Sequence, residues 1–559
     1  MSPRFLLATA SVALLASIPG TGAAGGTALH DYDAATLASY VSLRFSSAVP
    51  PNVIRQVLAG EGFSQADLDL VTTSTASVGR PSSNVGPPGV SSVQQISKDT
   101  LACPSSDPTP CELDTETEPD IAVNPLASGN LVAAFQQGRF RNGGAVDTGW
   151  ATSFDGGKTW PYKGSLPGLT VGVSPRPTPG PGVPFARASD PVVAYDSKHK
   201  NVLANDVAVS DSGCVVFCDS AVTVNISNNQ GQTFGPPIVL HEDVSDPNKT
   251  PLLFNDKNWI TTDNTPTSPF YGRTYAVWDQ VRCADMNCAV TSEPVVLRTS
   301  DDGGKTWSGL IQATDEQPGP VHSEIGVQPL VLPNGHVVIV FGDVQAGAFT
   351  FLGSYQAIRS TDGGRTWSPP VLITFADPFL EESAGLRAPN LPMAAVDGGT
   401  IYVAFQDERF GAGRNDILLT SSTNEGQSWS LPVNATPGEL GLDHFTPAVA
   451  ATGGKVHLTY RTRLPGNVNA PPASLVDAVY RALQGGATTS GPFVLATSDA
   501  GAAAFTTVAG VPLKFFGDYA GIAASSISAH PVWDQSQTFS DQQANPTNTH
   551  QRSFSARIQ

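Results

Sequence analysis

The chain has 559 residues, of which 40% are apolar and only 14% are charged, and it holds 54 glycines and 46 prolines. This composition is typical of an all-β protein in which many short strands are separated by turns. The formal net charge of −18 repels nucleic acid and anionic membrane surfaces, so we expect neither as a partner.

The first 24 residues are predicted to be a secretory signal peptide. Arg4 precedes an apolar run over residues 5–18, and small residues lead up to Ala24. After this run no stretch approaches the roughly 20 apolar residues that a membrane-spanning helix needs. We therefore expect a secreted, extracellular protein that is a monomer and has no membrane partner.

Residues 25–89 are predicted to form a short helical N-terminal segment and a linker. Apolar residues have helical spacing over 33–44, Pro51 can open a second helix, and Ser64 begins a stretch with the form of a capping box. Residues 80–89 are rich in Ser, Pro and Gly and are expected to connect this segment to a main domain over 90–559. Two roles stay open for the segment, a pro-region or a part that packs on the main domain.

Five copies of one eight-residue pattern recur in the main domain, starting at residues 153, 227, 300, 360 and 422. A repeat with a period of 60 to 74 residues predicts an array of similar supersecondary units. The clearest copy is Ser300-Asp301-Asp302-Gly303-Gly304-Lys305-Thr306-Trp307. Asp or Asn followed by Gly suits a tight hairpin, and the Trp can pack that turn onto its sheet.

The pattern resembles the Asp-box, S-x-D-x-G-x-T-W, of the sialidase-like β-propellers, which are built from BNR repeats. The resemblance covers roughly residues 115–535 and implies that each copy is a structural hairpin and not a catalytic motif. The implied fold class is an all-β β-propeller. Unit starts near residues 118, 190, 256, 324, 387, 444 and 517 give seven blades, with six as the alternative because sialidases have six. A strand near residues 90–96 is expected to close the ring.

The six cysteines fall into three close pairs, Cys103 with Cys111, Cys214 with Cys218, and Cys283 with Cys288. In an exported chain such pairs favour three local disulfides over a metal site, and no histidine stands at a zinc-like spacing. We predict no metal and no cofactor.

Chemistry is expected on one rim of the ring. If the Asp-box hairpins join the third and fourth strands, the starts of first strands and the ends of second strands share the opposite rim. Charged residues are frequent at these positions: Glu118, Asp120, Asp190, Asp256, Lys257, Glu324, Arg387, His444, Asp518, Arg139, Arg141, Asp279, Asp343, Asp407, Glu408, Arg409, Arg461, Arg463 and Asp534, together with Tyr519. Many of them are expected simply to bond the backbone of the next blade.

The resemblance implies roles for six of these residues. Sialidases clamp a carboxylate with three arginines, and the matching candidates are Arg139 (or Arg141), Arg409 and Arg461. They use a Tyr paired with a Glu as nucleophile and an Asp as acid/base, which implies Tyr519 with Glu324, and Asp190.

Three functions stay open at this point. The first is a sialidase-like glycoside hydrolase that acts on a glycan, with acidic sugars as candidate substrates. The others are a non-catalytic propeller that binds glycan or protein, and a polysaccharide lyase. Paired acids and arginines favour an enzyme, whereas the absence of a Phe-Arg-Ile-Pro segment before the first Asp-box favours binding.

Overall fold

The computed structural model describes residues 89–99, 101–103, 111–170, 185–209, 219–243, 251–284, 290–315, 321–346, 351–411, 413–439, 441–469, 473–508, 511–537, 539 and 550–559. The predicted signal peptide, helical segment and linker therefore lie outside the described residues, apart from Gly89. The described part is almost entirely β, with two short 3-10 helices, η1 (Glu381–Ala384) and η2 (Ala500–Ala502). The predicted all-β class is confirmed.

The first repeated unit shows the plan of the others. It contains β2 (Cys111–Val123), β3 (Leu131–Phe140), β4 (Ala145–Ser153) and β5 (Tyr162–Ser165), each antiparallel to the next. The first Asp-box forms the connection from β4 to β5, next to the end of β2 and the start of β3. The start of β2 lies at the other end of the unit, where Glu112 pairs with Arg139. The two-rim arrangement expected from the sequence is thus confirmed for this unit.

The other units follow in chain order, and the described residues contain six of them after the first. The second has β6 (Arg187–Asp196), β7 (Asn201–Val209), β8 (Ser220–Ser227) and β9 (Ile238–Asp243); the third has β10 (Leu252–Thr262), β11 (Thr274–Cys283), β13 (Val295–Ser300) and β14 (Ile311–Gln312), with β12 (Val290–Ser292) beside β11; the fourth has β15 (Val321–Val331), β16 (Val337–Ala346), β17 (Phe351–Ser360) and β18 (Val371–Ala376). The fifth has β20 (Met393–Asp397), β21 (Thr400–Asp407), β22 (Asp416–Ser422) and β23 (Val433–Asn434); the sixth has β24 (Asp443–Thr452), β25 (Lys455–Arg463), β26 (Leu475–Gln484) and β27 (Ala487–Asp499); the last has β30 (Ile522–Ser525), β31 (Ser528–Ser536), β32 (Gln551–Ile558) and β1 (Val90–Gln95).

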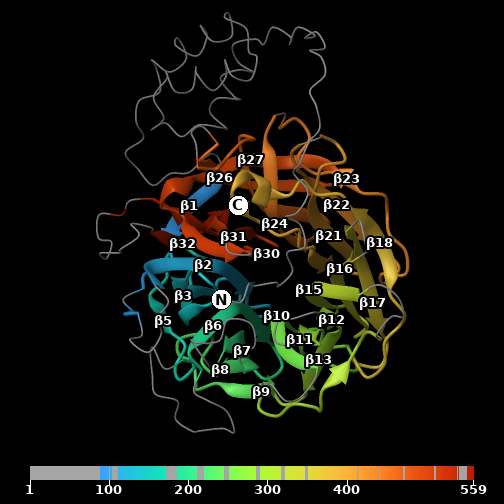
Figure 1. Cartoon of the computed structure of the whole chain (residues 1–559). Coiled ribbons are helices and arrows are strands. Elements are labelled where there is room, and N and C mark those ends of the chain that lie inside the picture. The colour runs from blue at the N-terminus through green and yellow to red at the C-terminus, as the bar shows by residue number, and fades with distance from the viewer. Residues whose placement is uncertain are drawn as a thin grey trace, which may run out of the picture.

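The units succeed one another around a common centre, from blue and cyan through green and yellow to red (Figure 1). The first strand of each unit contacts the first strand of the next, in the order β2, β6, β10, β15, β20, β24 and β30, and β30 in turn contacts β2. The final unit is completed by the earliest strand, because β1 pairs antiparallel with β32. Closure of this kind removes exposed sheet edges at the join.

Neighbouring units are held together by apolar packing and by the Asp-box turns. Val132 and Ala134 of the first unit pack with Tyr195 and Phe234 of the second. The Thr152 hydroxyl donates to the Gly231 carbonyl in the second Asp-box over 2.6 Å. In the next pair of units, the Asn201 amide donates to the Gly303 carbonyl of the third Asp-box over 3.0 Å. The Asp-boxes are therefore joints between units as well as hairpins.

The Asp-box tryptophans differ in burial. We expected the three of the strongest copies to be largely buried. Trp160 is 6% exposed, whereas Trp307 and Trp367 are half-buried. The expectation is confirmed for Trp160 only. The indole N–H groups of the two others donate to the Gly304 and Gly364 carbonyls of their own Asp-boxes.

One predicted disulfide is formed in the described residues, between Cys103 and Cys111, whose Cα atoms are 5.7 Å apart. Cys283 is also disulfide-bonded. Cys214, Cys218 and Cys288 lie outside the described residues.

A small three-stranded sheet stands apart from the repeated units. It contains β19 (Leu386–Arg387), β28 (Ala504–Val508) and β29 (Val511–Phe515), and β19 pairs parallel with β29, placing Arg387 opposite Phe515. Among the described helical segments, none has the length and apolar character to span a membrane.

Candidate active site

The first strands of the units contact one another around the centre of the ring, and we call them the inner strands. Several of them carry a bulge at the same position. The pairing register shifts between Thr117 and Asp120 in β2, between Ser189 and Val192 in β6, and between Asp256 and Trp259 in β10. Each bulge holds a non-glycine residue in the left-handed region, with φ of 55° at Glu118, 53° at Asp190 and 38° at Lys257. Bulges re-aim side chains, and strained backbone of this kind is concentrated at functional sites.

These three side chains meet near the centre of the ring. The Lys257 Nζ lies 3.5 Å from Asp190 Oδ1 and 3.6 Å from the centroid of the Tyr519 ring. Tyr519 belongs to the segment before β30, so the contact joins the third unit to the last. The Glu118 Oε1 accepts the Asp518 N–H over 3.3 Å in the same place.

Two arginines border this group on the side of the small sheet. The Arg139 guanidinium stacks 4.5 Å from the centroid of the Phe515 ring, and Arg387 lies 5.9 Å from the same ring. Arg387 also forms a two-pronged ion pair with Asp518, with 2.6 Å between Nε and Oδ1. We call Glu118, Arg139, Asp190, Lys257, Arg387 and Asp518 the central charged cluster.

Burial controls the electrostatics of the cluster. Glu118 is 2% exposed, Arg139 5%, Lys257 6% and Asp190 7%. The pKa of the Glu118 carboxyl is raised to about 8, first by burial and then by the charges of Asp190 and Asp518, against the charges of Arg139 and Lys257. Glu118 is therefore protonated at neutral pH. General acid–base catalysis needs a proton donor and a proton acceptor, and a protonated carboxyl beside a second carboxyl can supply both.

Tyr519 is anchored below the cluster. It is 1% exposed, its hydroxyl donates to the Pro191 carbonyl over 2.9 Å, and its ring makes an edge contact with Trp259. Burial raises the pKa of this hydroxyl well above its usual range, and the charges of Glu118 and Asp190 act in the same direction. The surroundings thus keep Tyr519 as a neutral phenol.

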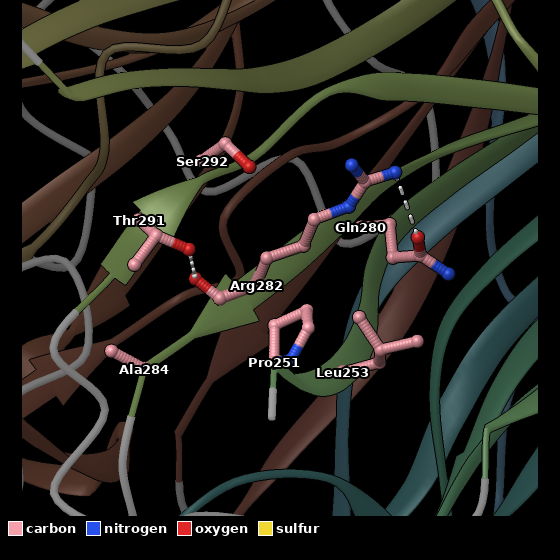
Figure 2. A pocket seen from close by; sticks show the side chains of 7 residues that line it. All are labelled: Pro251, Leu253, Gln280, Arg282, Ala284, Thr291 and Ser292. Atoms are coloured by element: carbon pink, nitrogen blue, oxygen red, sulfur yellow. Dashed lines mark hydrogen bonds between the residues drawn. The ribbon is translucent and has the colours of Figure 1, made fainter. Parts of the chain in front are cut away.

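A pocket of about 560 Å³ lies elsewhere on the same rim, in the third unit. Figure 2 shows Arg282 with Gln280, Thr291 and Ser292 on its walls, together with Pro251, Leu253 and Ala284. Gln280 follows Asp279 on β11, so the two side chains point to opposite faces of the sheet. Asp279, which interacts with Glu293 and with Lys257, is thereby on the side of the cluster and not of the pocket.

A family model described as a BNR repeat-like domain matches residues 129–458, which is more than half of the chain. The chain belongs to this family. The matched region runs from the start of the second strand in the first unit to the second strand of the sixth, and so contains all five Asp-boxes. The sialidase-like resemblance expected from the sequence is confirmed.

Solved structures similar to this BNR repeat-like protein include three glycan-processing enzymes. An intramolecular trans-sialidase from Ruminococcus gnavus is 14% identical over 65% of this chain and 92% of its own, with a TM-score of 0.37. An α-L-arabinofuranosidase from Fusarium graminearum is 14% identical over 70% and 98%, with a TM-score of 0.41, and a Hadza microbial sialidase is 11% identical over 83% and 98%, also with 0.41. No curated protein sequence matches the chain.

The BNR ring brings together three of the six residues predicted from the sequence. Asp190 and Arg139 belong to the central charged cluster, and the Tyr519 ring contacts it through Lys257. The acidic groups that act on Tyr519 are Glu118, Asp190, Asp120 and Asp206.

The other three predicted residues have different surroundings. Glu324 accepts hydrogen bonds from the Thr314 hydroxyl and, over 3.1 Å, from the Val295 N–H of the preceding unit. Arg409 folds back on Asp407, with 2.6 Å between Nε and Oδ1. Arg461 is 2% exposed, donates to the Asp534 carbonyl over 2.7 Å, and stacks on Phe516.

Sequence reasoning listed Glu118, Lys257, Arg387 and Asp518 among the rim residues without selecting them as site residues. It did not list Gln136, a buried residue of β3 that bonds Glu118 and Arg139. One sequence signal could have found two bulge positions, because Glu118 and Asp190 each stand directly before a proline. Within the described residues, no group of three or more His, Cys, Asp or Glu side chains is arranged to hold a metal ion.

Proposed function

We propose that this protein is a glycoside hydrolase that acts on a glycan at the central charged cluster. The observation that carries the proposal is the pair of carboxyl groups formed by Glu118 and Asp190. The two residues lie on adjacent inner strands, each at the bulge of its own strand. Glu118 holds a proton at neutral pH and is proposed as the acid that protonates the leaving-group oxygen. Asp190 is proposed as the second carboxyl group of the pair, the ionised one, which acts on the reacting sugar.

The cationic groups of the cluster support an acidic sugar as substrate. Arg139, Lys257 and Arg387 face Asp190 and Asp518, while Glu118 is neutral, so the six residues of the cluster alone carry an excess of one positive charge. Asp120 and Asp256 also act on these residues, but burial raises the pKa of each to about 7 and so reduces their negative charge. A guanidinium at this position suits a carboxylate of the substrate. We propose Arg139 as the principal binding residue, and keep Arg409 and Arg461 as outer candidates.

The Tyr519–Glu324 pair predicted from the family resemblance is the alternative nucleophile. The contacts of both residues favour the carboxyl pair instead. The Tyr519 hydroxyl is committed to the Pro191 carbonyl, and the Glu324 carboxylate to Thr314 and Val295.

The ring itself is proposed to be a seven-bladed β-propeller, in preference to the six-bladed alternative. The succession of contacts among the seven first strands, and the pairing of β1 with β32, support this number. Export through residues 1–24 is likewise a proposal, and the Cys103–Cys111 disulfide supports an oxidising destination.

A non-catalytic propeller that binds glycan or protein is the second candidate. The internal pairing of the cluster favours it, since Arg387 is bound to Asp518 and Lys257 is packed on Tyr519. A lyase, the third candidate, is distinguished by its product.

The test is a screen of the purified protein on fluorogenic glycosides, sialosides first, together with acidic polysaccharides. Glu118→Gln and Asp190→Asn are expected to lower kcat at least about a hundredfold, the usual range for loss of a general acid or base. Asp155→Ala, on the opposite rim, is the control and should keep kcat. Glycan binding without turnover would support the second candidate instead, and unsaturated, ultraviolet-absorbing products would support the lyase.

A further inference from the structure

Gln136 connects three members of the central charged cluster, Glu118, Arg139 and Asp190. It lies on β3, is fully buried, and uses both ends of its amide. The Oε1 accepts hydrogen bonds from Arg139 Nη1 over 2.7 Å and from the Thr117 hydroxyl over 3.0 Å. The Nε2 donates to Glu118 Oε2 and, over 3.0 Å, to the Ser189 hydroxyl.

The chemistry of its neighbours fixes the direction of this amide. A guanidinium has only donors, so the oxygen of Gln136 must face Arg139 and the NH₂ group must face Glu118 and Ser189. Ser189 then receives a hydrogen from Gln136 and has one hydrogen to give. It donates to Asp190 Oδ2 over 2.9 Å. The chain of donors therefore runs from Arg139 through Gln136 and Ser189 to Asp190.

This direction decides where a proton can reside. Glu118 Oε2 and Asp190 Oδ2 both face donors, so neither oxygen can carry a hydrogen toward its partner. Glu118 Oε1 also faces a donor, the Asp518 N–H, but at the longer distance of 3.3 Å, so this oxygen is the better place for a proton on Glu118. The two carboxyl groups are thus made unequal by a neutral side chain.

We propose that Gln136 is a positioning residue that assigns the acid and base roles, because its N–H favours the proton of Glu118 on Oε1 and, through Ser189, holds Asp190 as an acceptor. The reaction-level part of this inference rests on the proposed hydrolase function. The part that concerns proton placement does not.

The groups that face Glu118 come from four elements. They are Asp190 on β6, Asp518 in the segment before β30, Arg139 on β3 and Lys257 on β10. The Gln136 N–H adds a donor that stabilises the ionised carboxylate, so its removal should raise the pKa of Glu118. The Asp518 pair with Arg387 is not contacted by Gln136 in the described hydrogen bonds and should keep its charge.

The experiment uses Gln136→Met, which keeps the length of the side chain and removes the amide. Gln137→Met is the matched control, because Gln137 is the next residue, is 4% exposed, and bonds Ser165 instead of the cluster, over 2.8 Å. Ser189→Ala is a second variant that cuts the link to Asp190 and leaves the Gln136–Glu118 contact.

The first measurement is a pH titration by infrared difference spectroscopy, in which the carboxylic band missing from Glu118→Gln is assigned to Glu118. In the wild type its midpoint should lie near pH 8, the pKa of Glu118. The midpoint should move upward in Gln136→Met and stay in place in Gln137→Met and Ser189→Ala. An unchanged midpoint in Gln136→Met overturns the inference, whether or not the protein is an enzyme.

The second measurement is the pH dependence of kcat and KM on the substrate found in the screen. Gln136→Met should lower kcat roughly tenfold to a hundredfold, as misplacement of a catalytic group does, with KM little changed. The alkaline limb of the pH–kcat profile of Gln136→Met should move to higher pH, as the infrared midpoint does. Ser189→Ala should lower kcat and move the acid limb upward, and serves as the kinetic test if Gln136→Met does not fold. A purely structural role would leave both limbs in place, and that result overturns the assignment.

Discussion

Glu118 and Asp190 occupy the same position of adjacent inner strands, and both adopt left-handed backbone, with φ of 55° and 53°. The corresponding position in the third unit is Lys257, whereas the fourth unit has Gly326, which adopts this conformation freely. A non-glycine residue there costs on the order of 1–3 kcal/mol. The three units that accept this cost with a charged residue are those whose side chains meet in the central charged cluster.

The protein is expected to be more stable at pH 5 than at pH 8.5. Burial raises the pKa of six carboxyl groups to about 7 or 8: Glu118, Asp120, Asp206, Asp256, Glu324 and Asp534. Between their ordinary values near 4 and these raised values, the folded state binds more protons than the unfolded state. The free energy of unfolding must then fall as pH rises through this window.

Two histidines act in the opposite direction over part of that window. Burial lowers the pKa of His457 and His530 to about 4, so their contribution is lost as pH falls from 6.5 to 4. Six carboxyls outweigh two imidazoles. Urea unfolding at several pH values checks the slope, and Glu324→Gln should flatten it by at most about 1.4 kcal/mol per pH unit between 4.5 and 7. Stability that rises from pH 5 to 8.5 would contradict the prediction.

An Asp-box substitution should change stability and leave chemistry alone. Asp302 Oδ1 accepts the Lys305 and Thr306 N–H groups over 3.0 and 2.9 Å, and Oδ2 accepts the Thr306 hydroxyl. Asp302→Ala should cost about 1–2 kcal/mol, in line with the loss of a capping side chain. Asp302→Asn is the matched control, because Asn424 makes the same turn contact to the Ser428 N–H in the fifth Asp-box. Equal losses in the two variants would argue against this account.

Repeats and alternation made the fold predictable from the sequence. The five Asp-boxes located the hairpins from β4 to β5 through β22 to β23, and apolar second strands located the two units without a box. The strand predicted at residues 456–460 lies within β25, and that at 529–533 lies within β31. Both signals lie within short stretches of sequence. Their order along the chain gave the order of the units around the ring.

The site was less predictable because it depends on local exceptions and on distant pairing. A bulge breaks the period of two, so the direction of Lys257 could not be read from its place in β10. Arg387 and Asp518 are 131 residues apart and meet because β19 pairs with β29. Arg409 bonds the carboxylate of Asp407, which is close to it in the sequence, and so does not join the central charged cluster.

A buried ion triad is expected to be a sensitive joint between η1 and the sixth unit. Arg463 Nη2 lies 2.7 Å from Glu381 Oε2 and 2.9 Å from Asp443 Oδ2, and all three side chains are fully buried. Arg463→Met leaves two acids without their cation and should cost about 3–5 kcal/mol. Arg365→Met, on an exposed arginine bonded only to the Asp362 carbonyl among the described contacts, should cost less than about 0.5 kcal/mol. Urea unfolding at pH 7 measures both, and similar values would reject the difference.

Tyr519→Phe separates the two nucleophile assignments. The substitution removes one oxygen, which leaves the Pro191 carbonyl without its partner in a fully buried place and should cost about 1–3 kcal/mol of stability. With Glu118 and Asp190 as the reacting groups, the variant should keep at least about a tenth of the wild-type kcat, because the ring, its contact with Lys257 and the position of both carboxyls are retained. The measurement is kcat on the best substrate of the glycoside screen, at a temperature where urea unfolding shows the variant to be folded.

Glu324→Gln is the companion variant, since Glu324 bonds Thr314 and Val295 and should also be dispensable for turnover. Loss of nearly all turnover in both variants, with Glu118→Gln still active, would instead make Tyr519 and Glu324 the nucleophile pair.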